Sequence, residues 1–450
     1  MLEHETRERH AASAIPFAVP RNRWSDAEAA GKSPEELLLY RSNLLGADLT
    51  VTNFGGGNTS AKIEMVDPLT DAPATVLWVK GSGGDIGSMR LDGFATLYLD
   101  KLLGLESRYR GVDFEDEMVG YLPHCTFNLN ARAASIDTPL HAYLPYPHVD
   151  HVHPDAIIAL AASSAGKAAT DAIWGGAIGW LPWKRPGFEL GLQLRQLVTE
   201  QPSLRGAMLE GHGIICWGDT AKACYDNTVA LIADAAHYLN ERLALGPAFG
   251  GERVAPRPAA ERAAIAARLM PRLRALMPGE RGKIGHFSDD PETLEFAGSR
   301  DFARLAAIGT SCPDHFLRTK IAPLALDPAR LDDEAYLAQA LEDYRQLYAA
   351  YYQRCAEPGD PAMRDPNPVV VLVPGVGRIT FAADKTTARL AGEFYGNAIN
   401  VMRGAEAIGD YVGLPEKEAY RIEYWALEEA NIRCDRLLSD RKSTRLNSSH

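Results

Sequence analysis

The chain has 450 residues, 46% of them hydrophobic and 24% charged, which is enough for about two to three globular domains. A formal net charge of −12, with no concentrated basic patch, excludes nucleic acid and membrane surfaces as expected partners. The polar N-terminus, the lack of an apolar run that could span a bilayer and the scattered cysteines without a Cys-x-x-Cys pair predict a reduced, cytoplasmic protein.

The first part of the chain alternates between helix-like and strand-like patterns after a polar arm at residues 1–24. Apolar periodicity and cap residues predict, in chain order, a helix at 25–47, strands at 61–65 and 75–80, helices at 97–103 and 138–144, a strand at 149–152, a helix at 154–165, a strand-like stretch at 207–216 and a helix at 221–245. This order predicts one α/β domain over 25–245. The pattern does not reveal whether its sheet is parallel.

A Gly- and Pro-rich linker at 246–258 precedes a second, smaller α/β domain of unknown role at 259–439. Its predicted elements are helices at 259–276, 333–356, 384–402 and 416–435 and a strand at 368–373. Residues 440–450 resemble the translation of a sequencing-adapter oligonucleotide. We therefore expect this tail to be foreign to the fold and the native protein to continue past residue 439.

The most informative motif is His151-Val-His153. Side chains two apart on a strand share one face, so both imidazoles can hold one cation. His212, between two glycines, is the third candidate, and three histidine ligands with an open fourth position are typical of a catalytic zinc. Asp150 and Asp155 flank the pair and are candidate hydrogen-bond partners of the ligands. The alternative is that the histidines are ordinary core or surface residues, with His212 shaping a turn.

Asp137 lies four residues before His141, a spacing that puts two side chains on one face of a helix. A carboxylate near a metal site is a natural general acid/base. The alternative is that Ser135 or Asp137 caps the helix predicted to start at Thr138.

Two glycine-rich loops, Gly55-Gly-Gly-Asn-Thr-Ser60 and Gly81-Ser-Gly-Gly84, combine exposed backbone N–H groups with small polar side chains. Successive donors of this kind cradle a phosphate, and glycine allows its close approach. Neither loop has the Gly-Lys-Ser/Thr ending or the G-x-G-x-x-G spacing of a nucleotide site. Plain turn geometry is the alternative. A further polar segment, Thr310–Lys320, has no assigned mechanism, and a packed interdomain contact explains it equally well.

Four segments, taken in order, resemble the class II aldolase/adducin family: Gly57-Asn-Thr-Ser60, Lys80-Gly-Ser-Gly83, Ser135-Ile-Asp-Thr-Pro-Leu-His141 with His151-Val-His153, and Gly211-His-Gly213. They lie within residues 25–245. Two later segments, Ser311–Lys320 and Val401–Ala407, look like the larger bifunctional rhamnulose-1-phosphate aldolase/short-chain dehydrogenase proteins. The resemblance implies that this chain is the aldolase half of such a protein, truncated before the dehydrogenase domain.

The resemblance implies a class II aldolase-like domain, with a central sheet flanked by helices, followed by the smaller α/β domain. It also implies an oligomeric enzyme that uses Zn²⁺ to cleave a phosphorylated ketose, L-rhamnulose 1-phosphate, into dihydroxyacetone phosphate and L-lactaldehyde. The family's zinc positions match His151, His153 and His212, and its phosphate contacts match Asn58, Ser82, Gly83 and Ser135. Its acid/base is a glutamate, whereas this chain has the shorter Asp137.

Three other functions share these motifs. A sugar-phosphate 4-epimerase or a methylthioribulose-phosphate dehydratase of the same superfamily would use the same metal chemistry. A non-catalytic, adducin-like interaction module would need no metal, so the three histidines favour an enzyme.

Overall fold

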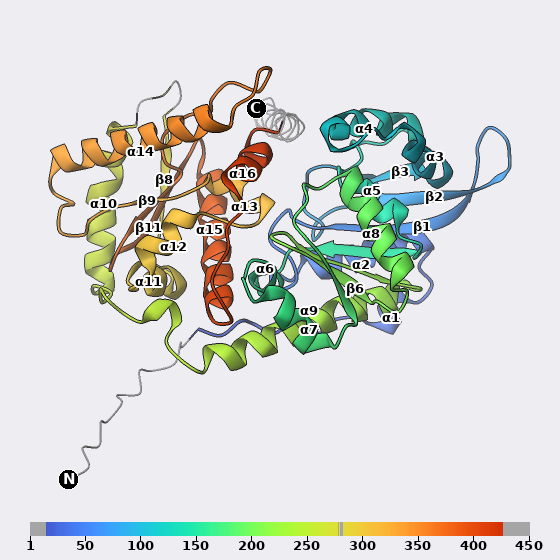
Figure 1. Cartoon of the computed structure of the whole chain (residues 1–450), viewed down its shortest axis with the longest axis horizontal. Coiled ribbons are helices and arrows are strands. Elements are labelled where there is room, and N and C mark those ends of the chain that lie inside the picture. The colour runs from blue at the N-terminus through green and yellow to red at the C-terminus, as the bar shows by residue number, and fades with distance from the viewer. Residues whose placement is uncertain (1–14, 278, 280–281, 426–450) are drawn as a thin grey trace, which may run out of the picture. The chain divides into compact units, whose positions relative to one another are not determined.

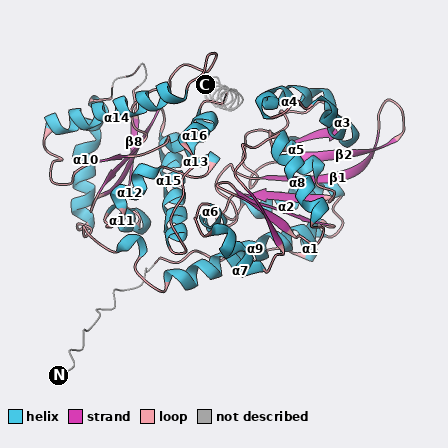
Figure 2. Ribbon diagram, viewed as in Figure 1, coloured by secondary structure: helices cyan, strands magenta, loops and turns pink. Residues whose placement is uncertain are grey.

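A computed structural model describes residues 15–277, 279 and 282–425, which form two compact units (Figure 1). The seven-stranded unit comprises Val19–Ala161, Lys167–Ala235 and the described residues from Tyr424 onward. The four-stranded unit comprises Ala162–Gly166, Ala236–Glu423 and the described residues up to Ala18. Each unit has its own sheet with helices around it (Figure 2).

The sheet of the seven-stranded unit is mixed, with the order β3-β2-β1-β4-β7-β6-β5. Neighbouring strands are antiparallel except for β5 and β6. The strands are β1 (Asn58–Val66), β2 (Pro73–Lys80), β3 (Phe94–Tyr98), β4 (His148–Val152), β5 (Ile178–Leu181), β6 (Gly206–Leu209) and β7 (Gly213–Gly218). Because β1 pairs with β4 in the middle of the sheet, Asn58 lies directly opposite His151.

Nine α-helices accompany this sheet within the described residues, and the last of them continues into the sequence of the other unit. They are α1 (Asp26–Ala29), α2 (Pro34–Gly46), α3 (Leu99–Gly104), α4 (Glu115–Tyr121), α5 (Thr138–Tyr143), α6 (Asp155–Ala161), α7 (Gly166–Trp174), α8 (Phe188–Glu200) and α9 (Ala221–Leu243), with 3-10 turns at Leu91–Gly93, Leu105–Arg108, Val112–Phe114 and Leu122–Cys125.

The two faces of this sheet bury different side chains, because successive strand residues point to opposite sides. On β1, Ala61 and Ile63 pack with Leu38 of α2. Asn58 and Ser60 point the other way, where they contact α5 and the residue before it. The apolar core on this second face includes Leu140, Leu144, Val149, Leu190, Leu194, Leu209 and Ile215.

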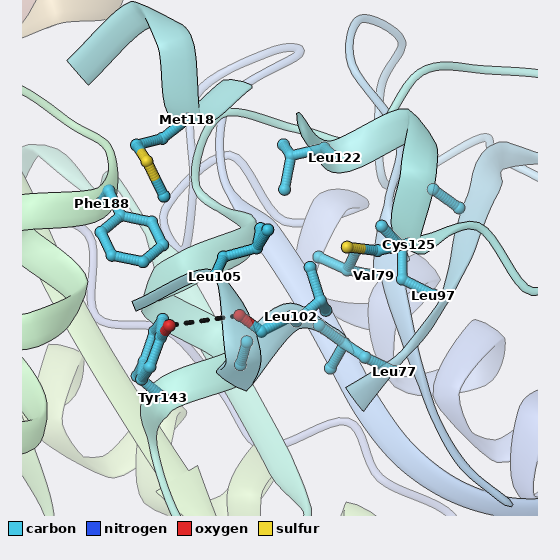
Figure 3. Close-up of a cluster of buried hydrophobic side chains, with 12 residues drawn as sticks. Leu77, Val79, Leu97, Leu102, Leu105, Met118, Leu122, Cys125, Tyr143 and Phe188 are labelled. Carbon is cyan, nitrogen blue, oxygen red and sulfur yellow. Dashed lines mark hydrogen bonds between the residues drawn. The ribbon is translucent and has the colours of Figure 1, made fainter. Parts of the chain in front are cut away.

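A second apolar cluster covers the β2–β3 end of the same face (Figure 3). Its side chains come from the two strands, from α3, α4, α5 and α8, and from the turns between them: Leu77, Val79, Leu97, Leu102, Leu105, Met118, Leu122, Tyr143 and Phe188. Each large apolar side chain buried in this way contributes about 1.5–3 kcal/mol. The Tyr143 hydroxyl donates a hydrogen bond to the carbonyl of Leu102 at 3.2 Å, so this buried polar group is satisfied.

The four-stranded unit has the sheet order β8-β11-β10-β9, in which only β9 and β10 are parallel. Its strands are β8 (Ile284–Ser288), β9 (Leu324–Ala325), β10 (Val370–Val373) and β11 (Gly377–Ala382). Its helices are α10 (Ala259–Ala275), α11 (Pro291–Ala297), α12 (Phe302–Ile308), α13 (Pro313–Thr319), α14 (Glu334–Cys355), α15 (Lys385–Glu406) and α16 (Glu416–Glu423), with a 3-10 turn at Ala248–Gly250. Among the residues that the structure describes, no helix is both long and apolar enough to cross a membrane.

Three predicted elements of the first domain differ from the structure, and two of them are helices. The single helix predicted at 25–47 is divided into α1 and α2, because Ser33 and Glu36 form a capping box and Pro34 starts a new helix. The helix predicted at 97–103 begins only at Leu99, since β3 continues through Tyr98. A short apolar run does not by itself distinguish a strand from a helix.

The strand-like stretch predicted at 207–216 is a hairpin of β6 and β7 rather than one strand. Gly211 reverses the chain with a φ of +63°, a backbone conformation that glycine adopts without strain. The strand predicted at 368–373 is β10, which forms a second hairpin with β11. The predicted tail at 440–450 and the end of the helix predicted at 416–435 lie outside the described residues.

Candidate metal centre and anion-binding loops

The structure brings His151, His153 and His212 together at one end of β4. His151 is in the strand, His153 follows it, and His212 lies in the turn between β6 and β7. The Nε2 atom of His151 is 2.9 Å from that of His153 and 3.2 Å from that of His212. All three side chains are buried. Three imidazole nitrogens at tetrahedral positions around zinc would be about 3.4 Å apart, so this spacing fits one cation.

The hydrogen bond of His151 fixes which of its nitrogens can bind a metal. Its Nδ1 lies 3.0 Å from the carbonyl oxygen of Ile214, which can only accept, so Nδ1 carries the proton. The lone pair therefore lies on Nε2, among the other two imidazoles. Burial, with further contributions from His153 and His212, holds the pKa of His151 well below its ordinary value. A neutral imidazole with Nε2 free of its proton is the form that ligates metals.

The glycines around His212 have separate roles. Gly211 supplies the positive φ of the turn. A Cβ atom at Gly213 would lie 2.7 Å from Cδ2 of His153, so only glycine lets the hairpin approach that imidazole. The turn geometry that was the alternative explanation for His212 is therefore the means by which its ring reaches the other two.

Asp150 does not serve the histidines, contrary to one of the sequence-based alternatives. It lies on the opposite face of β4, where its carboxylate pairs with the Nε of Arg41 at 2.9 Å. Its other oxygen accepts a hydrogen bond from Thr228 of α9 at 3.1 Å. Alternation along the strand forces this separation, because His151 points to one face and Asp150 to the other. The partner of His151 is a backbone carbonyl, which sequence patterns do not reveal.

Asp137 occupies the N-cap position of α5, but its side chain makes no capping hydrogen bond. Its Oδ2 instead accepts a hydrogen bond from Nδ2 of Asn58 at 2.5 Å. The backbone N–H of Asp137 donates to Oγ of Ser135 at 3.2 Å. Because Asn58 is opposite His151 in the sheet, the buried carboxylate is connected to the histidine cluster through one residue.

His141 shares this face of α5, as its spacing from Asp137 predicts, and it contacts β1 two residues further along. Its Nδ1 is 2.8 Å from Oγ of Ser60. Burial, followed by the charges of Lys62 and Arg41, lowers the pKa of His141 to about 3, so the ring is neutral at physiological pH. His141 thus joins α5 to β1 beside the histidine cluster.

The two glycine-rich segments lie at the ends of neighbouring strands. Asn58 is the first residue of β1, and Gly81-Ser-Gly-Gly84 follows β2 directly. Gly81 forms an antiparallel bridge with Ala134, and the N–H of Ser82 donates to the carbonyl of Ala133 at 2.8 Å. The structure therefore aligns the loop of Ser82 and Gly83 with the segment that carries Ser135. Gly83 has a φ of +70°, which favours glycine at this position.

Trp183 is a neighbour of the cluster that no sequence signal indicated. Its ring centroid is 6.4 Å from that of His212. Its backbone N–H donates to a carboxylate oxygen of Glu210 at 3.0 Å, which holds the chain after β5 next to the β6–β7 turn. A half-buried indole beside a ligand imidazole can form an apolar wall of the site.

The polar segment Thr310–Lys320 lies in the four-stranded unit, where the contacts of its last residue, Lys320, are structural. It contains α13, and the amine of Lys320 donates to the carbonyls of Asp365 and Asn367, the latter at 2.7 Å. The amine also lies 4.0 Å from the ring centroid of Tyr348. Burial lowers the pKa of Lys320 to about 8. These contacts hold together three separate parts of the chain.

Comparisons with known proteins identify the families that the chain resembles. Residues 37–239 match the family described as Class II Aldolase and Adducin N-terminal domain. Residues 264–432 match the family described as Aldolase class II, second domain. The chain is also 39% identical over 410 residues to the Bacillus subtilis (strain 168) protein named "Uncharacterized oxidoreductase YuxG", an alignment that covers 90% of this chain and 59% of that relative. The chain thus spans less than two thirds of the relative's length.

Two solved structures illustrate the likeness. The N-terminal class II aldolase domain of a conserved protein from Thermoplasma acidophilum is 30% identical and covers 49% of this chain and 100% of its own, with a TM-score of 0.45. An L-fuculose-1-phosphate aldolase from Thermus thermophilus is 16% identical and covers 46% of this chain and 97% of its own, with a TM-score of 0.32. The fold is the predicted one, and the chain carries the domains of the class II aldolase/adducin family.

Proposed function

We propose that this chain is a Zn²⁺-dependent class II aldolase that cleaves a ketose 1-phosphate, with L-rhamnulose 1-phosphate as the substrate and dihydroxyacetone phosphate and L-lactaldehyde as the products. The observation that carries the proposal is the convergence of the Nε2 atoms of His151, His153 and His212. A bound zinc would supply the positive charge that stabilises the enediolate formed when the carbon–carbon bond breaks.

In this proposal Asp137 accepts the proton of the substrate hydroxyl whose carbon becomes the aldehyde. Asn58 holds the carboxylate in place through its hydrogen bond to Oδ2 at 2.5 Å. The Asp137 side chain is one methylene shorter than the glutamate of the family. Because Asp137 is at the start of α5, against β1, the position of the helix backbone would determine how far the carboxylate reaches toward the substrate. The hydroxyls of Ser82 and Ser135, the backbone N–H of Gly83 and the amide of Asn58 would bind the phosphate.

The experiment is incubation of the zinc-loaded protein with L-rhamnulose 1-phosphate, with dihydroxyacetone phosphate measured through its reduction by a coupling enzyme. We expect release by the wild-type chain, and a loss of bound zinc together with a loss of at least ~10³-fold in turnover for His212→Ala. His124→Ala is the matched control, because His124 is an exposed histidine of the same unit outside the site.

The products also distinguish the other enzymes of the superfamily. An epimerised or dehydrated sugar phosphate without release of dihydroxyacetone phosphate would reassign the reaction. A chain that binds no divalent metal would support a non-catalytic, adducin-like module instead. A cytoplasmic homo-oligomer remains our expectation for the active form, to be tested by light scattering of the zinc-loaded protein.

A second proposal concerns the longer relative. The name of that Bacillus subtilis protein includes the word oxidoreductase, and the alignment covers 59% of it. We propose that this chain corresponds to the aldolase portion of a bifunctional aldolase/dehydrogenase. NAD(P)H production from lactaldehyde by this chain alone would contradict this proposal, because it would place dehydrogenase activity in the aldolase portion. Sequencing of the locus beyond the codon for residue 439 tests whether the coding sequence continues.

A further inference from the structure

Arg132 lies along the loop Gly81-Ser-Gly-Gly84, and its side chain explains two of the glycines there. A Cβ atom at Gly81 would lie 2.7 Å from Cβ of Arg132. A Cβ atom at Gly84 would lie 3.3 Å from both Cζ and Nη1 of its guanidinium. The Nη1 atom donates to the carbonyl of Ser82 at 3.3 Å. The guanidinium is therefore positioned directly over the loop that is our candidate phosphate cradle.

The charge of Arg132 is not matched by a carboxylate anywhere in the described part of the chain, although the side chain is half-buried. Three other arginines of the same unit do have carboxylate partners: Arg41 pairs with Asp150, Arg185 with Asp116 and Arg195 with Glu106. A guanidinium has five N–H donors in a rigid fork, and the carbonyl of Ser82 occupies one of them. The remaining donors are available to a ligand with negative charge.

The position of Arg132 relative to the histidine cluster suits a short phosphorylated substrate. Arg132 precedes Ser135 and Asp137 in one segment, and that segment is bridged to the end of β2 at Gly81. β2 is next to β1, and β1 is next to β4, which carries His151. Two strand spacings are about 10 Å, so one small molecule can reach from the cluster to the loop.

We propose that Arg132 is the cationic contact for the phosphate and that it determines the preference for phosphorylated over unphosphorylated ketoses. This inference rests on the proposed function. The other candidate contacts, Asn58, Ser82, Gly83 and Ser135, are neutral donors, so they would bind a sugar hydroxyl as well as a phosphate. An arginine stays charged at all physiological pH values and fits phosphate oxygens with two parallel hydrogen bonds.

The test compares Arg132→Ala and Arg132→Lys with wild type in two measurements: the dissociation constant for inorganic phosphate, by calorimetry, and the steady-state constants for ketose 1-phosphate cleavage. For Arg132→Ala we expect phosphate binding to weaken and KM to rise, each by about 10- to 100-fold, with a smaller change in kcat. Arg132→Lys should recover part of the loss, because it keeps the charge but not the fork. Arg21→Ala, which removes an exposed arginine of the same unit, controls for net charge.

A purely structural role for Arg132 would give a different pattern. Distortion of the loop would lower kcat/KM equally for a ketose 1-phosphate and for the same ketose without phosphate, whereas our proposal predicts that the ratio of the two falls about 10- to 100-fold. An unchanged phosphate dissociation constant in Arg132→Ala, or no phosphate binding by wild type, would overturn the inference while leaving aldolase activity intact. Arginine-dependent phosphate binding without any cleavage would refute the proposed function and leave the inference standing.

Discussion

Two polar clusters, one in each unit, are completed in different ways. In the four-stranded unit, two buried arginines are each paired with a half-buried carboxylate: Nη2 of Arg378 is 2.9 Å from Oδ2 of Asp290, and Nε of Arg403 is 2.8 Å from Oε2 of Glu295. In the seven-stranded unit, three imidazole nitrogens face one another on one side of β4. Lone pairs that converge in this way repel unless a cation or a proton lies between them.

This difference distinguishes residues that stabilise the fold from residues that can bind a ligand. A paired cluster is complete without any other molecule, whereas a cluster of acceptors is complete only with a cation. The same contrast holds within the seven-stranded unit, where the Arg41–Asp150 pair occupies the face opposite to His151. One strand, β4, thus has a structural face and a candidate functional face.

The largest effect on the candidate functional face is expected from Asp137→Asn, because this variant keeps the size and the hydrogen-bonding ability of the side chain but removes its charge. We expect turnover to fall by about 10²- to 10⁴-fold, the range for loss of a general acid/base, with bound zinc unchanged. Asp137→Glu restores the residue typical of the family and should retain much more activity. An unchanged rate in Asp137→Asn would assign the residue to packing at the start of α5.

The opposite expectation applies to a paired cluster of the four-stranded unit. Asp290→Ala leaves the buried guanidinium of Arg378 without its carboxylate partner. Because that carboxylate is 28% exposed, we expect a loss below the about 3–5 kcal/mol that breaking a fully buried pair costs. The free energy of unfolding from urea denaturation should fall accordingly, while zinc content at low temperature stays the same. A loss below ~1 kcal/mol would mean that solvent replaces the carboxylate and that the pairing is not structural.

Acid should destabilise the metal-free chain through His141. Its folded pKa of about 3 lies below the ordinary value of 6.5, so between these pH values the unfolded state binds the proton and the folded state does not. Stability is therefore lost as the pH falls below 6.5, by up to about 1.4 kcal/mol per pH unit. His141→Gln should show a shallower loss of the urea midpoint between pH 7 and pH 5. Equal slopes for the two proteins would contradict the assignment of a neutral, buried ring.

Lys320 should give the four-stranded unit a dependence on alkaline pH. Its folded pKa of about 8 lies below the ordinary 10.5, so between these values the unfolded state holds the proton that the folded state has released. Stability should rise over this interval, by at most about 1.4 kcal/mol per pH unit. The comparison of wild type with Lys320→Met by urea denaturation at pH 8 and pH 9.5 isolates this contribution, and a wild-type rise no larger than that of the variant would refute it.

Local patterns were sufficient where one residue type or one spacing determines geometry. The alternation in His151-Val-His153 predicts that both imidazoles share a face, and the glycines around His212 predict a turn. The fold class followed from the order of strands and helices, together with the resemblance of four motifs to one family. The roles assigned to the site residues themselves stay predictions until activity is measured.

Long-range pairing explains what the sequence left open. Asp150 pairs with Arg41 rather than with a histidine because α2 and α9 pack against β4. Nothing near Asp150 in the chain indicates this pairing. No local pattern indicates Arg132 either, since only the bridge between Gly81 and Ala134 places it over the glycine loop. The strand order of the sheet likewise depends on contacts between segments that are far apart in sequence.

Because the β6–β7 hairpin positions His212, metal binding depends on the order in which the strands of the sheet form during folding. His151 and His153 come from one short segment, but His212 reaches them only after β7 has paired with β4, with Ile215 opposite His151. A nascent or partly unfolded chain therefore offers two ligands, which hold a cation far more weakly than three. Metal capture then follows closure of the central sheet, so zinc should slow unfolding much more than it speeds folding, and its release would be an early sign that the β6–β7 hairpin has detached.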